Sequence, residues 1–387
     1  MAPSKPILIV GAGLAGCMMA IELARLDYRI VVFEKRALDS DPGGPRRSIN
    51  LALAPATMSL LKETANLSRK LKVIATPLQG RVLHPVAGKP KFQAYAKTPS
   101  GASLLNPAAG ASSVSRAGLN SMLRSAAAAH SNVEFRFGQK VTACDPDRSV
   151  LGIEDARGRS ASIEGEIIIG ADGALSAVRR LLALRRAGPR LREDRVALSH
   201  CYKEIRFAPP ASSRMRKRAL HIWPRAGFLL MALPNPDGDF TGGIFLRKQG
   251  SNGFSALKTE PAVRRFFEKN FQDVVSCMPD LAQQYAKNPV SPLTSVQCDP
   301  WHVGRAVLIG DACHTLYPFS GQGANLALED CLYLRRCIEQ FAPNWPRVFS
   351  HFTEQRKPQI DYLCQATRVL SPLLLSALPQ DGIAGRI

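Results

Sequence analysis

The stretch Ile7-Leu8-Ile9-Val10-Gly11-Ala12-Gly13-Leu14-Ala15-Gly16, close to the start of the chain, decides the fold. The four apolar residues at 7–10 predict a short buried strand, and the helical spacing of apolar residues in 14–26 predicts a helix directly after it. A second apolar run at 29–33 predicts another strand. Residues 6–34 therefore have the size and order of a strand–helix–strand crossover.

The glycines at positions 11, 13 and 16 form the pattern G-x-G-x-x-G between that strand and that helix. There the first glycine permits a tight turn, the second lets a pyrophosphate approach the backbone, and the third lets the helix pack on the strand. The phosphates would meet the free N–H groups of the helix N-terminus. Glu34 ends the second strand, where a carboxylate accepts hydrogen bonds from a ribose and repels a 2′-phosphate. This site is therefore expected to hold NAD or FAD, not NADP(H).

Two later segments decide between these cofactors. One buried strand leads into Gly170-Ala171-Asp172-Gly173, and another leads into Gly310-Asp311-Ala312. Asp311 at a strand end can hydrogen bond with the ribityl hydroxyls of a flavin, and NAD has no ribityl chain. Further on, Pro318-Phe319-Ser320-Gly321-Gln322-Gly323 precedes a predicted helix, whose N-terminus would stabilise an anionic reduced flavin by about 0.3–2 kcal/mol. The three motifs together favour FAD.

The pattern of predicted secondary structure changes between residues 185 and 295. Here short strands joined by turns, a pattern typical of an antiparallel sheet, replace the alternation of strand and helix. The strand–helix alternation of a nucleotide-binding domain returns after residue 295. The expected fold class is α/β: a Rossmann-like FAD-binding domain interleaved with an antiparallel-sheet substrate domain, plus a short C-terminal helical segment. The expected boundaries are 1–76, 104–184 and 296–342 for the FAD-binding domain, 77–103 and 185–295 for the substrate domain, and 343–387 for the C-terminal segment.

The amino-acid composition limits the kinds of ligand and partner that the protein is expected to bind. The chain has 387 residues, of which 45% are hydrophobic and 21% charged, so it is a globular protein rather than a disordered one. The net charge of +20 favours anionic ligands, and its two densest basic stretches, 179–195 and 213–218, are interpreted as a solvated face. They contain no aromatic residues, so nucleic-acid binding is not expected. The nine Cys residues include no C-x-x-C pair, so we expect reduced thiols and no metal site.

The motifs resemble those of the FAD-dependent aromatic hydroxylases, the single-component flavoprotein monooxygenases with the p-hydroxybenzoate hydroxylase fold. The resemblance spans about residues 5–345. Four segments are most similar to the kynurenine 3-monooxygenase branch: R-S-I-N-L-A-L at 47–53, H-I-W-P at 221–224, A-L-P-N at 232–235, and P-F-S-G-Q-G-A-N at 318–325 together with Glu329-Asp330. The resemblance implies hydroxylation of an aromatic acid, L-kynurenine at the ring position next to the amino group, with FAD as cofactor and NADPH or NADH as co-substrate.

The resemblance also implies roles for single residues. Arg81 and Tyr95 match an Arg and a Tyr that hold the substrate carboxylate, a role that suits a guanidinium fork and a phenol donor. Asn325 matches an Asn beside the substrate. Oxygen chemistry would belong to the flavin, so no catalytic side chain is expected, and Pro318, Phe319 and Gly321 would border the oxygen site. The candidate cofactor-binding residues are Gly11, Ala12, Gly13, Leu14, Ala15, Gly16, Glu34, Lys35, Arg36, Arg47, Leu53, Arg116, Asp172, Asp311, Gly321, Gly323, Ala324 and Asn325.

The C-terminus departs from the family. Relatives carry a helix whose Tyr also reaches the substrate, whereas residues 367–375 here contain no Tyr. The apolar run at 369–378 would be about 15 Å long as a helix, too short to cross a bilayer core of about 30 Å. Three roles stay open for this segment: lying on a membrane surface, covering the pocket, or forming a dimer. His221 and Trp223 could line the pocket, but packing in the core is the expectation for both.

The expected partners are therefore a small aromatic substrate, O2 and NAD(P)H, and the protein would be a monomer or a homodimer. No secretory signal is apparent, which favours the cytoplasm, with the outer mitochondrial membrane surface as an alternative in a eukaryote. Two other functions remain open. One is hydroxylation of another aromatic carboxylate, and the other is a degenerate flavoprotein that binds FAD as a redox sensor without oxygenation.

Overall fold

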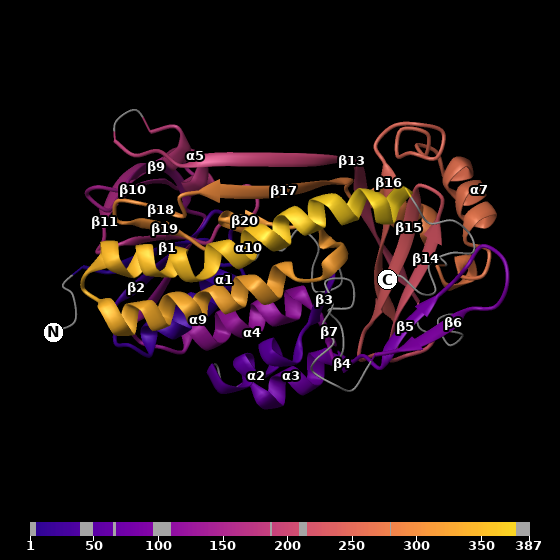
Figure 1. Ribbon diagram of the computed structural model, residues 1–387, viewed down its shortest axis with the longest axis horizontal. Coiled ribbons are helices and arrows are strands. Elements are labelled where there is room, and N and C mark those ends of the chain that lie inside the picture. Colours follow the sequence, from indigo (N-terminus) through magenta and orange to yellow (C-terminus); the bar gives the residue numbers. More distant parts are fainter. Residues whose placement is uncertain are drawn as a thin grey trace.

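The computed structural model describes residues 5–38, 49–64, 67–95, 110–185, 188–208, 215–278 and 280–376. Figure 1 shows an elongated molecule with a parallel-sheet half at one end and an antiparallel-sheet half at the other. Three long elements reach from one half to the other: strands β13 (Arg192–Phe207) and β17 (Ser291–Asp299) and helix α10 (Trp345–Ser376).

The parallel half is built on a six-stranded sheet in the order β18-β19-β12-β1-β2-β8. Strand β1 (Ile7–Val10) lies inside it, and Leu8 pairs with both Ile168 and Val31. All neighbouring strands are parallel except β18 and β19, so β1, β2, β12 and β19 end at the same edge. Their residues are buried throughout, as expected when both faces of a sheet are covered. The other bounds are Ile30–Glu34 for β2, Val133–Phe137 for β8, Ile168–Gly170 for β12, His302–Val303 for β18 and Ala306–Leu308 for β19.

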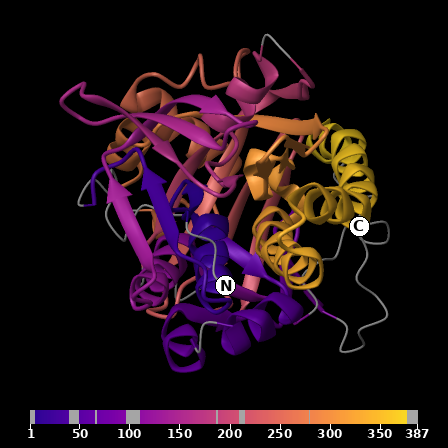
Figure 2. The same cartoon turned by 90° about the vertical axis from the view of Figure 1, so that its left-hand side faces the viewer.

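Helices cover one face of this sheet and a small antiparallel sheet covers the other, as the two ribbon views show (Figures 1 and 2). Helix α1 (Leu14–Ala24) is buried along its whole length between α4 (Arg116–Ala128) and α9 (Gly323–Phe341). On the opposite side lie β9 (Lys140–Asp145), β10 (Val150–Glu154) and β11 (Ser160–Glu164), with α5 (Ala177–Ala183) against β9.

The antiparallel half is an eight-stranded sheet in the order β20-β17-β13-β16-β15-β14-β5-β6. Alternate residues of β15 serve two different cores. Phe228 and Leu230 pack under helices α7 and α8 on what we call the outer face, whereas Leu229 packs with Phe245 on the inner face. The bounds are Gly80–Leu83 for β5, Lys91–Ala94 for β6, Ala219–Arg225 for β14, Phe228–Pro234 for β15, Phe240–Arg247 for β16, His314–Thr315 for β20, Glu260–Asn270 for α7 and Leu281–Lys287 for α8.

A third small sheet joins the two halves. Its strand order is β3-β7-β4, with bounds Asn50–Leu53 for β3, Ser112–Ser115 for β7 and Ala75–Pro77 for β4. Helices α2 (Pro55–Thr64) and α3 (Ser68–Ile74) lie between β3 and β4 along the chain. The Asn50 side-chain amide in β3 donates to the Pro234 carbonyl at 3.1 Å and to the Asn235 side chain at 2.7 Å. Two of the family-like segments quoted above, R-S-I-N-L-A-L and A-L-P-N, therefore meet here.

Most elements lie where the sequence predicts them. Strands β1 and β2 and helix α1 have the predicted order within about two residues, and β5 and β6 form a hairpin at the edge of the antiparallel sheet. His221 and Trp223 are buried on the outer face, which confirms the expectation of core packing. The nine cysteines are all free thiols.

Three features differ from the sequence prediction. The sequence predicts one helix over 274–286, whereas the structure has a short 3-10 turn (Val275–Cys277) and a separate helix (Leu281–Lys287), because a proline at 279 disfavours helix at the residue before it. Strands β9 to β11 and helix α3 were not predicted, because these stretches are polar and weakly periodic. Helix α10 lies within the expected C-terminal segment 343–387, but it begins at Trp345 and continues past Pro358 and Pro372, so it is much longer than the apolar run at 369–378. Within the described residues, no helix is both long enough and apolar enough to cross a bilayer.

Candidate active site

The three glycine-containing motifs converge at the carboxyl edge of the parallel sheet. Gly11, Ala171 and Ile309 directly follow strands β1, β12 and β19. The amide N–H groups of Ala171 and Ile309 donate to the carbonyl oxygens of Val10 and Gly170 at the ends of the neighbouring strands. A Cβ on Gly11, whose φ is +104°, would lie 2.6 Å from the Ala171 carbonyl oxygen. Only glycine fits there, because any Cβ would clash with Ala171. The missing side chain lets the first and second motifs touch.

The loop between β1 and α1 forms an open cradle. A Cβ on Gly16 would lie 1.9 Å from the Gly11 carbonyl oxygen, so the helix sits directly on the strand end. A Cβ on Gly13 would instead meet no atom within 4 Å, and no side chain caps the N-terminus of α1. The uncapped helix N-terminus with free room at Gly13 is the arrangement that binds a pyrophosphate. Leu14 and Ala15 begin the helix and are buried, and Ala12 accepts a hydrogen bond from Asn120 of α4 at 3.2 Å.

Glu34 ends β2 next to this cradle. Its Oε2 accepts from the Ala12 backbone N–H at 3.1 Å, and its Oε1 accepts from the backbone and Nε of Arg36 at 3.0 Å. Burial alone would raise the pKa of Glu34, but these hydrogen bonds and the Arg36 charge lower it overall. The side chain is thus an ionised acceptor held at the cradle's edge, with lone pairs left for a ribose hydroxyl.

Replacing Glu34 with arginine is expected to weaken FAD binding strongly, because the cation cannot accept a ribose hydrogen bond and loses the Ala12 contact. Glu34→Gln should give a smaller loss, since it keeps one acceptor oxygen. Isothermal titration of FAD into the apoprotein measures both. Glu134→Arg is the matched control: it reverses a half-exposed carboxylate on the neighbouring strand β8 and should leave the affinity unchanged. Wild-type affinity in Glu34→Arg would remove Glu34 from the ribose.

The two aspartates of the later motifs have different surroundings. Asp172 accepts from the Ser176 hydroxyl at 2.5 Å and from the Ala177 N–H at 2.6 Å, so its carboxylate caps helix α5. Burial raises the pKa of Asp172 despite these bonds. Asp311 lies half-exposed in the turn after β19, and no described residue hydrogen bonds with its carboxylate. Asp311 is therefore the aspartate with free acceptor capacity toward the cradle.

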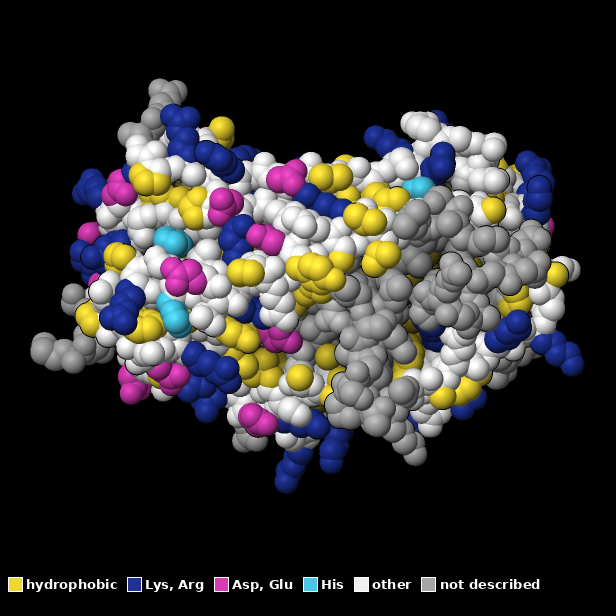
Figure 3. All heavy atoms as spheres, viewed as in Figure 1, with side chains coloured by type: hydrophobic (Ala, Val, Ile, Leu, Met, Phe, Trp, Pro, Cys, Tyr) yellow, Lys and Arg dark blue, Asp and Glu magenta, His cyan; other side chains and the backbone are white. Residues whose placement is uncertain are grey.

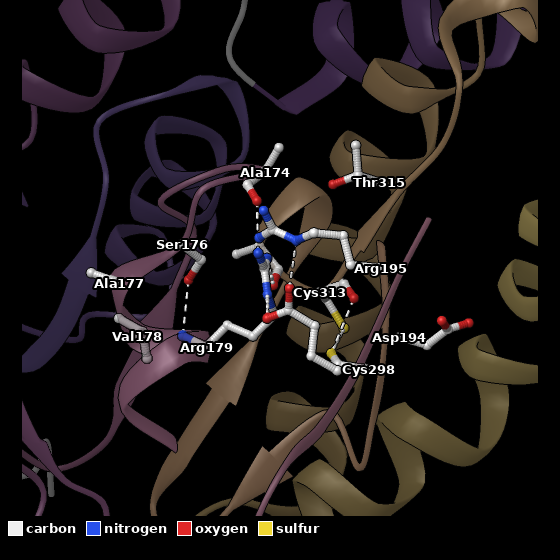
Figure 4. Close-up of polar contacts among 12 residues, drawn as sticks. Ala174, Ser176, Ala177, Val178, Arg179, Asp194, Arg195, Cys298, Cys313 and Thr315 are labelled. Carbon is white, nitrogen blue, oxygen red and sulfur yellow. Dashed lines mark hydrogen bonds and ion pairs between the residues drawn. The ribbon is translucent and has the colours of Figure 1, made fainter. Parts of the chain in front are cut away.

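Arg179 links the second and third motifs, as Figure 4 shows. It is 1% exposed, and its guanidinium donates to the carbonyl oxygens of Ala174 at 2.7 Å and Ala312 at 2.8 Å and pairs with Glu193 of β13 at 3.0 Å. This corrects the interpretation of 179–195 as a wholly solvated basic face. The sequence S-x-V-R after the glycines was the available signal, but it merged with the basic run that follows.

A buried charged cluster holds the third motif from behind. Asp330 of α9 accepts from the Gly310 N–H and from Nε of Arg356 in α10, both at 3.0 Å, and its Oδ2 lies 2.6 Å from Nε2 of His314. These three side chains are at most 2% exposed. Burial would raise the pKa of Asp330, but His314 and Arg356 lower it overall. Sequence reasoning placed Asp330 in a family-like segment but missed the cluster, because its members are distant in the chain and His314 and Arg356 belong to no motif.

The turn after the third motif carries the predicted oxygen site. Gly321 adopts a φ of +65° and ends the 3-10 turn Pro318–Ser320, and Gly323 begins α9. Pro318 is exposed, whereas the Phe319 ring lies 5.1 Å from the Phe245 ring on the inner face of the antiparallel sheet. This turn therefore touches both halves of the molecule.

Asn325 ties α9 to strand β3. Its Nδ2 donates to the carbonyls of Ala52 and Gly321 at 3.1 Å, and its Oδ1 accepts from the Ala54 N–H at 2.9 Å. The side chain is 2% exposed, so in this structure it positions the turn against β3. Leu53 beside it is fully buried in the core. Ala324, one residue before, is half-exposed at the start of the helix.

Of the remaining predicted residues, two belong to elements that reach this edge and one lies outside the described ranges. Lys35 lines a cavity of about 430 Å³ with Gly138 and Lys140 beyond the end of β2. Arg116 is exposed at the start of α4, and its N–H donates to the Ile49 carbonyl at 3.4 Å. Arg47 lies outside the described residues. No group of three or more His, Cys, Asp or Glu suited to a metal occurs in the described ranges.

Arg81 and Tyr95 come together on the hairpin β5–β6. Leu83, two residues beyond Arg81, pairs with Ile222, which pairs with Met231, so Arg81 belongs to the inner face. Tyr95 is buried against Leu233 of the same sheet. Burial raises the pKa of Tyr95 to about 12, and the nearby Arg81 charge partly opposes this rise. A cation and a phenol therefore lie side by side, with Gln93 accepting from Arg81 Nε at 2.7 Å.

Apolar side chains cover the rest of the inner face. Leu229, Phe245, Leu293, Tyr317 and Leu375 form one buried cluster, and Phe319, Tyr202 and Met231 pack against it. Leu375 comes from the last turn of α10, so the C-terminal helix reaches this face. The inner face thus offers an apolar wall beside the Phe319 turn and a cation farther along the sheet.

Comparisons with known proteins agree with this architecture. Residues 4–345 match the model of a family described as an FAD binding domain. The chain belongs to this family. It is 35% identical over 363 residues to the kynurenine 3-monooxygenase of Legionella pneumophila (strain Corby), covering 93% of this chain and 78% of that protein. It is 37% identical over 382 residues to the kynurenine 3-monooxygenase of Dictyostelium discoideum, covering 94% and 78%.

Solved structures show the same fold. PqsL of Pseudomonas aeruginosa superposes with a TM-score of 0.73 at 18% identity, covering 96% of both chains. The tetrameric form of 2-methyl-3-hydroxypyridine-5-carboxylic acid oxygenase superposes with a TM-score of 0.76 at 16% identity, covering 97% of this chain and 94% of that one. The expected fold class and family are therefore confirmed, and the chain is an FAD-dependent monooxygenase.

The residues present fit FAD. The open space over Gly13 can take the pyrophosphate, and the ionised Glu34 can take the ribose of the adenosine. Asp311 has a free carboxylate for the ribityl hydroxyls, and the N-terminus of α9 begins with two small residues and no side-chain cap. These groups lie along the strand ends from β2 to β19, which suits an extended cofactor.

Proposed function

We propose that this monooxygenase hydroxylates L-kynurenine to 3-hydroxykynurenine, using O2 and NADPH. The observation that carries the proposal is the pair of Arg81 and Tyr95 on the inner face, in the sheet that also meets the Phe319 turn. An amino-acid carboxylate needs such a donor set, since a guanidinium fork and a phenol both donate to it. The names of the relatives support the choice of kynurenine.

The side chains of the chain would orient the substrate rather than attack it. Bound FAD supplies the oxygen activation, so the protein needs no nucleophile of its own. Arg81 and Tyr95 would bind the carboxylate at one end, and the aromatic ring would extend along the apolar wall toward the Phe319 turn. Leu229, Phe245 and Leu375 would keep water away from the reacting atoms. This positioning is where the protein contributes to rate.

The test is a product assay. Purified protein is expected to be yellow with non-covalent FAD, and incubation with L-kynurenine, NADPH and O2 should give a product heavier by one oxygen atom in mass spectrometry. With oxygen-18 gas the label should enter the product, and omission of NADPH should abolish it. NADPH oxidation that yields only hydrogen peroxide with every aromatic acid supplied would favour the degenerate redox protein and refute the proposal.

One observation favours a second substrate. The last turn of α10 places Leu375, not a tyrosine, against the inner face. A tyrosine there would offer the substrate a further hydroxyl, so an aromatic carboxylate with fewer polar groups than kynurenine would fit this wall. A panel of aromatic acids in the NADPH oxidation assay separates the two. The burial of Leu375 also supports pocket cover as the role of the C-terminal segment, among the three left open.

A further inference from the structure

A polar cluster of two buried histidines and a half-exposed carboxylate lies on the outer face, directly behind the hairpin that carries Arg81. His84 follows β5, and its Nε2 lies 2.8 Å from Nδ1 of His221 in β14. The other nitrogen of His84 lies 3.1 Å from Asp273 Oδ2, and the other nitrogen of His221 lies 3.1 Å from the Arg216 carbonyl oxygen. The two imidazoles thus form a chain between a carboxylate and a carbonyl.

The hydrogen bonds of this chain fix its number of protons. The Arg216 carbonyl can only accept, so His221 Nε2 must carry a proton. The Asp273 carboxylate also accepts, since Trp223 Nε1 donates to the same Oδ2 at 2.7 Å, so His84 Nδ1 must carry a proton. The hydrogen bond between His84 Nε2 and His221 Nδ1 needs a third proton, on one of these two nitrogens. Three N–H groups are therefore shared by two rings, whereas two neutral imidazoles supply only two.

We propose that His84 and His221 hold an extra proton as an imidazolium–imidazole pair, with the charge on His84 beside Asp273, and that His84 acts as a positioning residue for the hairpin bearing Arg81. The second part rests on the proposed function, because it assigns Arg81 to the substrate carboxylate. The first part concerns the protonation of the folded protein and does not depend on its substrate.

The surroundings favour a charge on His84 rather than on His221. The Trp223 ring stacks on His84 with centroids 4.2 Å apart, an arrangement that attracts a cation. His221 is 1% exposed, and burial, with the His84 charge adding to it, lowers the pKa of His221 to about 4. Burial would raise the pKa of Asp273, but hydrogen bonds from His84 and Trp223 lower it overall, so its carboxylate stays ionised.

The other charged groups around the pair are cations. Arg225 at the end of β14 donates to the His84 carbonyl at 2.9 Å and to the Asn270 carbonyl at 2.6 Å. Arg216, before β14, stacks on Phe92 of β6 at 3.6 Å and contributes its carbonyl to His221. In the neighbouring strands His221 pairs with Val82 and Ala232, which carry no charge, and the Phe240 ring lies edge-on to it with centroids 5.4 Å apart. Asp273 is therefore the group that balances the extra proton.

The pair joins the hairpin to the rest of the sheet. Beyond its ring contacts, His84 donates its backbone N–H to the Ile222 carbonyl at 2.9 Å, so β5 is held to β14 and to the turn containing Asp273. Raising the pH removes the extra proton, and the chain then has one N–H too few for its three contacts. The end of β5 loosens, and Arg81, three residues earlier on the opposite face, loses its fixed position.

Protonation can be read directly by nitrogen-15 NMR of the histidine-labelled, FAD-loaded enzyme near neutral pH. We expect one ring with both nitrogens protonated and a partner ring with one, both sets of signals being assigned by their loss in His84→Gln and His221→Gln. In Asp273→Asn, which keeps the side-chain shape but removes the charge, the doubly protonated ring should disappear. Two neutral rings in the wild type would overturn the proposal, whatever the substrate is.

Kinetics test the link to Arg81. The KM for L-kynurenine should rise several-fold in the wild type between about pH 6 and about pH 9. In His84→Gln it should already be high at the lower pH and should not respond further, while FAD content and kcat at saturating substrate change little. His130→Gln, just after α4, is the control and should keep the wild-type profile. A wild-type KM profile in His84→Gln would refute the positioning role while leaving the NMR result and the proposed reaction standing.

Discussion

Asp330→Asn is expected to lower the free energy of unfolding by about 3–5 kcal/mol, because it removes the buried counter-charge of the Arg356 guanidinium and leaves only the partly exposed Glu329 beside it. The same change weakens the acceptor of the Gly310 N–H, which holds the third motif in its left-handed turn with a φ of +57°. Asp311 follows directly, so FAD retention should fall with stability. Urea unfolding of the FAD-free protein and flavin absorbance after gel filtration measure the two effects separately.

Glu329→Gln is the matched control for this change. Glu329 neighbours Asp330 in α9 and lies 3.4 Å from the same Arg356, but its side chain is 33% exposed, so water can replace the lost pairing. Its effect should be about 1 kcal/mol or less. Equal destabilisation by the two variants would show that buried charge pairing is not what matters at Asp330.

The Asp330 variant should also change how stability depends on pH. Because the pKa of Asp330 is lowered in the folded protein, its ionised form contributes stability that is complete above the ordinary carboxyl pKa. That contribution disappears as the pH falls through the lowered value. The wild type should therefore lose stability on acidification more steeply than the asparagine variant, which lacks the group.

The sequence predicted those parts of the molecule that depend on local backbone geometry. Gly11, Gly16 and Gly310 each stand where a Cβ would clash with, or crowd, a neighbouring segment, so their pattern carries the fold directly. Glu34 was equally accessible to prediction, because its distance from the glycines is set by one helix and one strand. For Gly16 and Glu34 the constraint acts within about 30 residues of chain, whereas the atoms that exclude a Cβ at Gly11 belong to Ala171 and Asp172.

Contacts between distant segments could not be predicted in the same way. Arg179 is buried against a turn more than 130 residues away, and a single sequence gives no sign of which arginine in a basic run will be enclosed. Asp330, His314 and Arg356 likewise meet only after α9 and α10 have packed. The side-chain role of Asn325 at β3 depends on such packing too, since its partners Ala52 and Ala54 lie about 270 residues earlier.

The inner face shows a third case, in which prediction depends on register. The family resemblance suggested Arg81 and Tyr95 as a pair, but only the pairing of β5 with β14, through Leu83 and Ile222, assigns Arg81 to the face that meets the Phe319 turn. A shift of one residue would turn Arg81 to the outer face, toward α7 and α8. The chain also places His84 on that outer face, which gives the same short strand two different tasks.

Arg81→Met should raise the KM for L-kynurenine by about 10- to 100-fold, since each hydrogen bond between charged groups is worth about 1.5–3 kcal/mol. Methionine keeps most of the length and apolar surface of arginine but cannot donate. FAD content should stay at the wild-type level, because the hairpin makes no contribution to the cradle around Gly13. The KM of Arg81→Lys should lie between those of the wild type and Arg81→Met, because lysine keeps the charge but lacks the planar fork.

Two controls make this result specific. Arg218→Met removes an exposed arginine close to the same hairpin, where Nε donates to the Pro77 carbonyl at 3.3 Å, and should leave the KM unchanged. An analogue of kynurenine without its carboxylate should bind the wild type as weakly as kynurenine binds Arg81→Met, and Arg81→Met should not weaken it further. If the analogue loses as much affinity as kynurenine does on that substitution, Arg81 acts through the shape of the pocket and does not bind the carboxylate.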